Sequence, residues 1–259
     1  MDLGLKGRVA VVTGASKGIG LSVVRGLVEE GADVVAGALT SSPELDELAD
    51  TAAVRVLEVD LATPHGPGQL LALAGDRVDV LVNNVGAAHP RTEGFLAVTD
   101  DEWAQSIALN LMAAVRATRA ALPAMLNAGR GVVISIGSVN ARLPDPAVVD
   151  YSAAKAALTN WSLSASKEFG GQGIRFVTVH PGPVATDLWL GGDGVAARVS
   201  AASGRTAREV ETAAVAGTAT RRFTQPHEVA DLVVLLASDR LANLTGAGVT
   251  IDGGLVPTL

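Results

Sequence analysis

The sequence contains no cysteine, which excludes disulfide bonds, thiol catalysis and cysteine-ligated metal sites. Aromatic residues are scarce as well: they make up 3% of the chain, and Tyr151 is the only tyrosine among 259 residues. A hydrophobic core must therefore be built from Ala, Val, Leu and Ile, which the 48% hydrophobic content provides. The four histidines show no ligand spacing, so we expect structural or surface roles for them and no metal site.

Runs of positive charge and long apolar runs are also missing. The 20 Lys and Arg residues are outnumbered by 27 Asp and Glu residues, and no Lys/Arg-rich stretch offers a surface for nucleic acid or an anionic membrane. The N-terminus lacks the basic and apolar segments of a signal peptide, and no apolar run approaches the about 18 residues of a membrane span. We therefore expect a soluble, cytoplasmic protein that binds neither nucleic acid nor membrane.

Short apolar runs alternate with helix-length segments along the chain. A capping box, Thr99-Asp-Asp-Glu102, begins a long helix that we expect to continue to about Asn127. Seven strands are expected at 8–14, 33–38, 54–59, 78–82, 132–136, 174–179 and 248–251. This order predicts an α/β fold: a Rossmann-like, doubly wound, parallel seven-stranded sheet with helices on both faces, in a single domain spanning 1–259. The segment 186–224 has no strand signal, and we expect it to form a lid over the substrate.

The first strand ends in a glycine-rich stretch, Thr13-Gly-Ala-Ser-Lys-Gly-Ile-Gly20. In a doubly wound sheet, ligands bind at the carboxyl ends of the strands. Glycines there let the backbone turn tightly and approach a pyrophosphate, and the next helix offers free N–H groups. The stretch therefore indicates phosphate binding, although an ordinary tight turn between strand and helix would look similar.

Tyr151 and Lys155 lie one helical turn apart, on the same face of a predicted helix. A free tyrosine titrates near pH 10, so working at about pH 7 requires about 4 kcal/mol in favour of the phenolate. One positive charge about 4 Å away, at an effective dielectric near 20, supplies about that much. The pair could thus be an acid–base catalyst. Alternatively, the phenol ring packs in the core and the lysine is solvated.

These motifs, in this order, resemble those of the short-chain dehydrogenase/reductase family, in its compact single-domain branch. The resemblance covers nearly the whole chain, with one mild departure: Val85 stands where the family has alanine in Asn83-Asn-Val-Gly86. Further matches are Asp60 after the third strand, Asn110 in the long helix, Ser138 thirteen residues before Tyr151, Pro181-Gly-Pro-Val184, Thr186, Thr245-Gly and Asp252-Gly-Gly254.

The resemblance implies four catalytic residues: Ser138, Tyr151, Lys155 and Asn110. Tyr151 would exchange a proton with the substrate oxygen, Ser138 would hydrogen-bond that oxygen, and Lys155 would lower the Tyr151 pKa and bind the nicotinamide ribose. Asn110 would hold a water that relays protons. Ser138 could instead cap the strand end, and Asn110 could lie on a solvated helix face.

The resemblance also implies a nicotinamide cofactor. Its binding residues would be Gly14, Ser16, Lys17, Gly18, Ile19, Gly20, Leu39, Thr40, Asp60, Leu61, Asn83, Gly86, Tyr151, Lys155, Pro181, Gly182, Val184 and Thr186. An acid at the end of the second strand would favour NADH, and this chain has none there. Lys17 and the hydroxyls after Leu39 could hold a 2′-phosphate, so we expect NADP(H), with NAD(H) as the alternative. Leu39 stands where many NADP-preferring relatives have arginine, and Lys17 could be a solvated loop residue.

The substrate is expected to be apolar or ring-bearing, because Leu188, Trp189 and Leu190 lie in the expected lid. Ser138 and Val139, with Leu188 and Trp189, are the expected substrate contacts, although Trp189 and Leu190 could merely pack the lid against the body. The resemblance suggests reduction of a ketone to a secondary alcohol, on a polyketide, 3-oxoacyl or steroid-like substrate. It also suggests a homotetramer, with a dimer second. Two alternatives remain open: an NAD-dependent secondary-alcohol dehydrogenase and a non-catalytic nucleotide-sensing regulator.

Overall fold

The computed structural model describes residues 2–51 and 53–257, and within these ranges seven parallel strands form one sheet. The strand order is β3-β2-β1-β4-β5-β6-β7. From β1 the chain first adds strands on one side, up to β3, and then on the other side, from β4 to β7, so the order of addition reverses between β1 and β4. The strands are β1 (Val9–Thr13), β2 (Asp33–Ala38), β3 (Val54–Glu58), β4 (Val80–Asn83), β5 (Gly131–Ile136), β6 (Ile174–Pro181) and β7 (Ala247–Ile251). The predicted parallel seven-stranded sheet is therefore confirmed.

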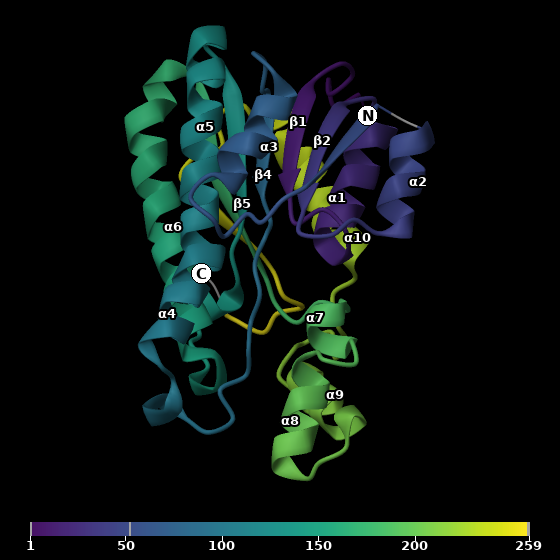
Figure 1. The fold of residues 1–259 in the computed structure, drawn as a ribbon, viewed down its shortest axis with the longest axis vertical. Coiled ribbons are helices and arrows are strands. Elements are labelled where there is room, and N and C mark those ends of the chain that lie inside the picture. The colour runs from purple at the N-terminus through teal and green to yellow at the C-terminus, as the bar shows by residue number, and fades with distance from the viewer. Residues whose placement is uncertain (1, 52, 258–259) are drawn as a thin grey trace.

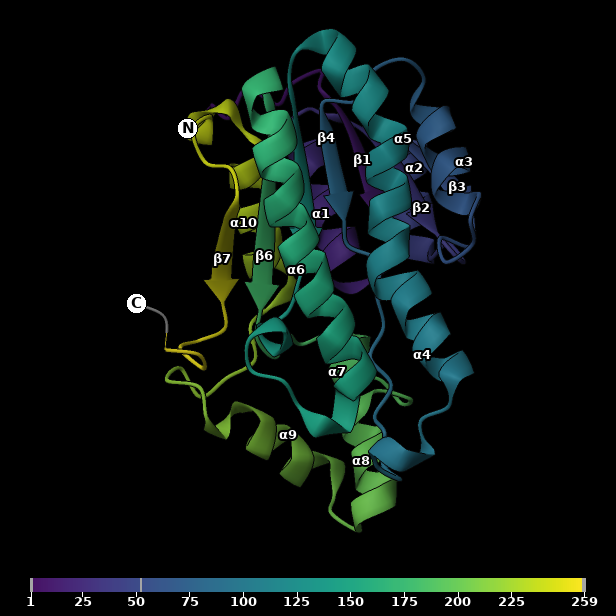
Figure 2. The same ribbon diagram turned by 90° about the vertical axis from the view of Figure 1, so that its left-hand side faces the viewer.

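Helices cover both faces of the sheet (Figures 1 and 2). One face carries α1 (Gly18–Glu29), α2 (Pro43–Thr51) and α10 (Pro226–Ala237). The other carries α3 (Gly66–Ala74), α5 (Ala113–Ala128) and α6 (Val149–Phe169). Each face has its own core of Ala, Val, Leu and Ile, because successive side chains of a strand point to opposite faces. In β1, Ala10 and Val12 join the core under α1 and α10, while Val11 joins the other.

The long helix expected from Thr99 to Asn127 is interrupted. The capping box is present, and α4 (Asp100–Ile107) begins directly after Thr99. A π-helical turn, Ala108–Met112, then separates α4 from α5. In this turn the N–H of Ala113 donates to the carbonyl of Ala108, five residues back. Such turns often occur at functional sites, and this one contains Asn110.

The segment 186–224 contains three helices that the sequence did not indicate: α7 (Asp187–Leu190), α8 (Val195–Ser203) and α9 (Ala207–Ala216). They lie beyond the carboxyl ends of the strands, apart from the sheet (Figures 1 and 2). The chain enters and leaves this lobe through neighbouring residues, since Val184 and Thr224 form a parallel bridge. Among the described residues, no helix combines the length and apolar character needed to cross a bilayer.

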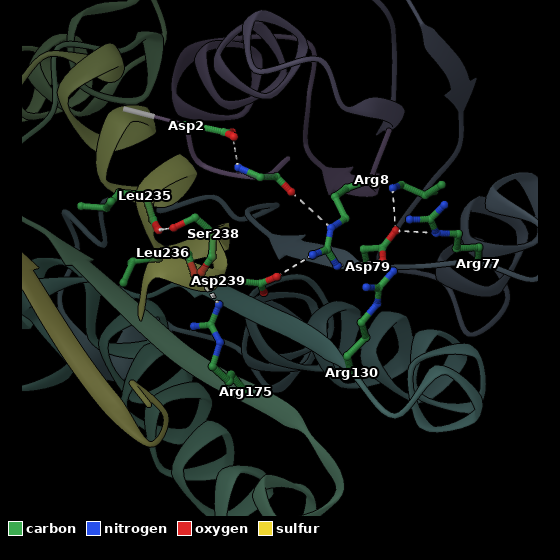
Figure 3. Close-up of polar contacts among 12 residues, drawn as sticks. Asp2, Arg8, Arg77, Asp79, Arg130, Arg175, Leu235, Leu236, Ser238 and Asp239 are labelled. Atoms are coloured by element: carbon green, nitrogen blue, oxygen red, sulfur yellow. Dashed lines mark hydrogen bonds and ion pairs between the residues drawn. The ribbon is translucent and has the colours of Figure 1, made fainter. Parts of the chain in front are cut away.

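The amino ends of the strands carry a cluster of charged side chains (Figure 3). Asp79, which is 5% exposed, accepts hydrogen bonds from the Val9 N–H and from Arg8, and it pairs with Arg77 and Arg130. Burial would raise the pKa of Asp79, but the Val9 N–H and the neighbouring guanidinium groups outweigh it and hold that pKa below its ordinary value. These charged contacts lie at the end of the sheet opposite the three-helix lobe (Figures 1 and 3).

Candidate active site

A cavity of about 1140 Å³ lies at the carboxyl ends of the strands, lined by the loops that follow them and by the α7–α9 lobe. Its walls come from the loops after β1, β4, β5 and β6, from the start of α6, and from the lobe itself. Its position is where ligands bind in doubly wound sheets, because the strand order reverses there. The predicted glycine loop and the predicted catalytic residues meet at this cavity.

The glycine loop requires glycine for steric reasons. Gly14 and Gly18 have positive φ angles of 66° and 57°. A Cβ atom on Gly20 would lie 2.1 Å from the carbonyl oxygen of Gly14, which no side chain could tolerate. The N-terminus of α1 has no side-chain cap, so its N–H groups stay available to a phosphate. The loop thus fits the pyrophosphate of a dinucleotide.

Asn84, and not the expected cofactor contact Asn83, joins this loop to β4. The Asn84 amide donates to the carbonyls of Thr13 and Gly14 at 2.9 and 2.8 Å, and the residue lines the cavity. Asn83 is 3% exposed and donates to Thr118 at 3.1 Å, away from the cavity lining. Adjacent side chains near a strand end point in opposite directions, so only the three-dimensional structure shows which of the two asparagines faces the glycine loop.

The four predicted catalytic residues come from three elements. Ser138 follows β5, Tyr151 and Lys155 lie in the first turns of α6, and Asn110 lies in the π-helical turn. The Lys155 ammonium lies 5.6 Å from the centre of the Tyr151 ring and donates to the Ile136 carbonyl at 2.8 Å. Ser138, Tyr151 and Lys155 all line the cavity.

Asn110 reaches the site from behind Gly86. A Cβ atom on Gly86 would lie 2.7 Å from the Asn110 side-chain oxygen and 3.2 Å from the Lys155 nitrogen. Asn110 also accepts the Ala87 N–H and donates to the carbonyls of Ala87 and Ser106. Asn110 and Lys155 therefore face the same space, which stays open because residue 86 is glycine. Asn110 is 2% exposed, so it does not lie on a solvated helix face.

Burial shifts both ionisable groups of the pair. It raises the pKa of Tyr151, and the hydrogen bond with Ser138 lowers that pKa by less. Burial also lowers the pKa of Lys155 to about 8. The sequence predicted that Lys155 would lower the pKa of Tyr151. In the structure the desolvation of the phenol dominates instead, and the lysine charge is not among the causes. The phenol is therefore neutral at pH 7 and equipped to donate a proton.

His180 supports Ser138 from below. The residue is 1% exposed, and its Nδ1 lies 3.2 Å from the Ser138 carbonyl oxygen. Because a carbonyl can only accept, Nδ1 carries the hydrogen. Burial lowers the His180 pKa, so the ring stays neutral. His180 therefore has a structural role: it holds the backbone of Ser138, a predicted catalytic residue.

Only part of the expected cofactor-binding set lines the cavity. Gly14, Ser16, Lys17, Gly18, Ile19, Gly86, Pro181, Gly182, Val184 and Thr186 line the cavity, whereas Leu39, Thr40, Asp60 and Leu61 do not. Leu61 is buried in the core under α3, and Leu39 is 73% exposed. The ammonium of Lys17 lies 3.4 Å from an Asp187 carboxylate oxygen, with both side chains largely exposed.

Val139, Leu188 and Trp189, three of the expected substrate contacts, line the cavity. Trp189 also packs against Phe223 in an edge-to-face contact, with ring centroids 5.8 Å apart. It therefore contributes both to the wall and to the packing of the lobe. Leu190 is absent from the lining residues.

An ion-pair network that the sequence does not predict lies at the start of α6. Arg91 pairs with Asp150, which directly precedes Tyr151, and with Glu102 of α4. The Asp150 side chain is 3% exposed, so the network fixes the N-terminus of α6, and with it Tyr151, against α4. Sequence offers no signal for it, because 59 positions separate Arg91 from Asp150.

Comparisons with known proteins agree with this geometry. The family model described as short chain dehydrogenase matches residues 8–191. The chain is 30% identical to the 3-oxoacyl-(acyl-carrier-protein) reductase of Vibrio cholerae, over 98% of this chain and 99% of that one. It is 34% identical to a 3-alpha-(or 20-beta)-hydroxysteroid dehydrogenase of Mycobacterium tuberculosis, over 98% and 92%. The crystal structure of L-sorbose reductase from Gluconobacter frateurii, complexed with NADPH and L-sorbose, superposes with a TM-score of 0.89 at 32% identity, covering 100% of both chains.

Proposed function

Because the chain belongs to the short-chain dehydrogenase family, a family of oxidoreductases acting on CH–OH or C=O groups, we propose that it is an NADPH-dependent reductase of ketones. The observation that carries this proposal is the meeting of Ser138, Tyr151 and Lys155 in one cavity with the glycine loop. The product is a secondary alcohol.

The residues of the chain supply the proton and orient the substrate. The cofactor, when bound, supplies the hydride. Tyr151 donates its phenolic proton to the carbonyl oxygen, and its raised pKa suits this direction because the phenol is fully protonated at pH 7. Ser138 donates a hydrogen bond to the same oxygen. Lys155 contacts the nicotinamide ribose, and Asn110 holds a water beside Lys155 that returns the proton to Tyr151.

The cofactor assignment rests on the ends of β1 and β2. Lys17 lines the cavity, β2 ends in Ala38 without an acid, and the hydroxyls of Thr40 and Ser42 follow. L-sorbose reductase, which shares the fold across the full chain, was crystallised with NADPH. NADP(H) is therefore the proposed cofactor. An NAD-dependent secondary-alcohol dehydrogenase is the second candidate, favoured by the pairing of Lys17 with Asp187.

The proposed substrate is apolar or ring-bearing, and of polyketide, 3-oxoacyl or steroid-like type. Val139, Leu188 and Trp189 form an apolar stretch of the cavity wall, and relatives named for 3-oxoacyl and hydroxysteroid substrates span the whole chain. Residues 186–224 act as the lid within a single domain of residues 1–259. Residues of α7, α8 and α9 line the cavity together with Ser138.

We further propose a cytoplasmic homotetramer, with a dimer second. The outward face of α6 presents small exposed side chains at Ala153, Ala156 and Ala157 and an exposed Leu163. Such a face lets a second helix approach closely, as expected if α6 packs against its symmetry mate.

The test is the absorbance of the nicotinamide ring, followed in the purified protein with NADPH or NADH and a panel of cyclic, 3-oxoacyl and steroidal ketones. We expect oxidation of NADPH with at least one ketone. Binding of neither NADPH nor NADH would refute the proposal. Dinucleotide binding without turnover of any ketone or alcohol would favour a nucleotide-sensing regulator.

A further inference from the structure

The end of β2 is where a dinucleotide-binding sheet usually distinguishes NADH from NADPH, by an acid that contacts the 2′-hydroxyl of the adenosine ribose. This chain has no acid in Ala38-Leu39-Thr40. The neighbouring strand provides one instead. Strands β2 and β3 pair in parallel with Ala38 beside Glu58, so Glu58 ends β3 next to the last residue of β2.

The Glu58 side chain turns toward the loop after β2. Its carboxylate accepts the backbone N–H of Ser41 at 2.7 Å. The hydroxyl of Ser41 donates to the Asp46 carboxylate at 2.6 Å. Both donors of Ser41 are thus occupied by carboxylates and are not available to a 2′-phosphate.

No cation neutralises these carboxylates within the described part of the chain, where neither Glu58 nor Asp46 forms an ion pair. Lys17, the expected partner of a 2′-phosphate, pairs with Asp187. A phosphate arriving at this loop would meet negative charge. A ribose hydroxyl would meet an acceptor, because a carboxylate has lone pairs beyond the one that Ser41 occupies.

We propose that Glu58 is a specificity-determining residue for the cofactor, which limits the preference for NADPH and keeps NADH usable. From β3 it takes the place of the acid that NADH-binding sheets carry at the end of β2. This inference rests on the proposed function, since it presupposes that a nicotinamide dinucleotide binds at the cavity.

The test compares dissociation constants for NADP⁺ and NAD⁺, measured by calorimetry, in the wild type, Glu58→Gln and Asp50→Asn. Removing the Glu58 charge should tighten NADP⁺ binding about tenfold, as expected for one charge near a dianion at the protein surface. Binding of NAD⁺ should stay constant or weaken. Asp50→Asn removes an exposed carboxylate from the end of α2, away from Ser41, and should leave the ratio of the two constants unchanged.

Thermal unfolding of each variant shows whether it folds, and Glu58→Ser provides a second substitution at this exposed position. An unchanged ratio in both Glu58 variants, or an equal tightening in Asp50→Asn, would overturn the assignment while leaving the proposed function intact. A wild-type protein that binds neither dinucleotide would overturn both.

Discussion

Replacement of Lys155 by methionine should stabilise the protein while removing its activity. Lys155 is 3% exposed, and the hydrogen bond of its ammonium to the Ile136 carbonyl is joined by no ion pair among the described residues. Burial lowers its pKa from 10.5 to about 8. A difference of about 2.5 pKa units corresponds to a cost of about 3 kcal/mol for keeping the protonated lysine in the folded state.

Methionine has a similar shape and carries no charge, so it avoids this cost. Loss of the hydrogen bond to Ile136 should destabilise the variant by about 1 kcal/mol and so reduce this gain. The net gain of about 2 kcal/mol predicts a rise in Tm of about 4–8 °C at pH 7, for a chain of this size.

The gain should depend on pH in a defined direction. Below pH 8 the lysine is protonated in both the folded and the unfolded state, and the folded state bears the full cost. Between pH 8 and 10.5 the folded lysine loses its proton first, so the wild type becomes relatively more stable and the advantage of methionine shrinks.

The assay is thermal unfolding followed by circular dichroism, without added cofactor, at steps from pH 6 to 9.5. Lys167→Met, which removes an exposed lysine from the last turn of the same helix, is the control and should show no such dependence. A Lys155→Met protein that is less stable than the wild type, or whose Tm difference is the same at pH 6.5 and 9.5, would refute the reasoning.

Three further changes test the rest of the site. Tyr151→Phe should lower turnover by about 10²–10⁴-fold while leaving the dissociation constant for NADPH within about twofold, and full turnover would mean that another group donates the proton. Gly20→Ala should abolish dinucleotide binding in a calorimetric titration, because its Cβ would lie 2.1 Å from a backbone oxygen, whereas Gly68→Ala, with nothing within 4 Å, should bind normally. Arg91→Met leaves the Asp150 carboxylate buried without its cation and should cost about 3–5 kcal/mol in urea unfolding, and a loss below 1 kcal/mol would show that Asp150 does not depend on it.

The sheet and the glycine loop could be predicted because their signals are local. Each buried strand is a short apolar run, and the loop is a fixed spacing of Gly14, Gly18 and Gly20 between a strand and a helix. The capping box at Thr99 likewise marked the start of α4 to the residue. Hydrophobic periodicity and backbone sterics decide these features within a few residues of sequence.

Features that depend on contacts between distant segments could not be predicted. The apolar pattern of the sequence does not change at the π-helical turn that contains Asn110. The turn is visible only in the structure, where the Asn110 amide donates a hydrogen bond to the Ala87 carbonyl. The role of Glu58 depends on its register beside Ala38 in the neighbouring strand. The Tyr151 pKa is raised and not lowered, because the desolvation of the buried phenol, which the sequence does not reveal, outweighs the hydrogen bond with Ser138.

The arrangement separates the chemistry from the choice of substrate. Ser138, Lys155 and Asn110 are buried, and they lie directly after β5, in α6 and in the π-helical turn. Leu188 and Trp189 lie on the four-residue helix α7, which has no buried residue and lies beyond the carboxyl ends of the strands (Figure 2). We therefore expect a substitution in the lobe to change the cavity wall without moving Tyr151. Relatives named for 3-oxoacyl, hydroxysteroid and L-sorbose substrates match this chain along nearly its whole length, so we expect residues 186–224, more than the residues around Tyr151, to decide which substrate binds.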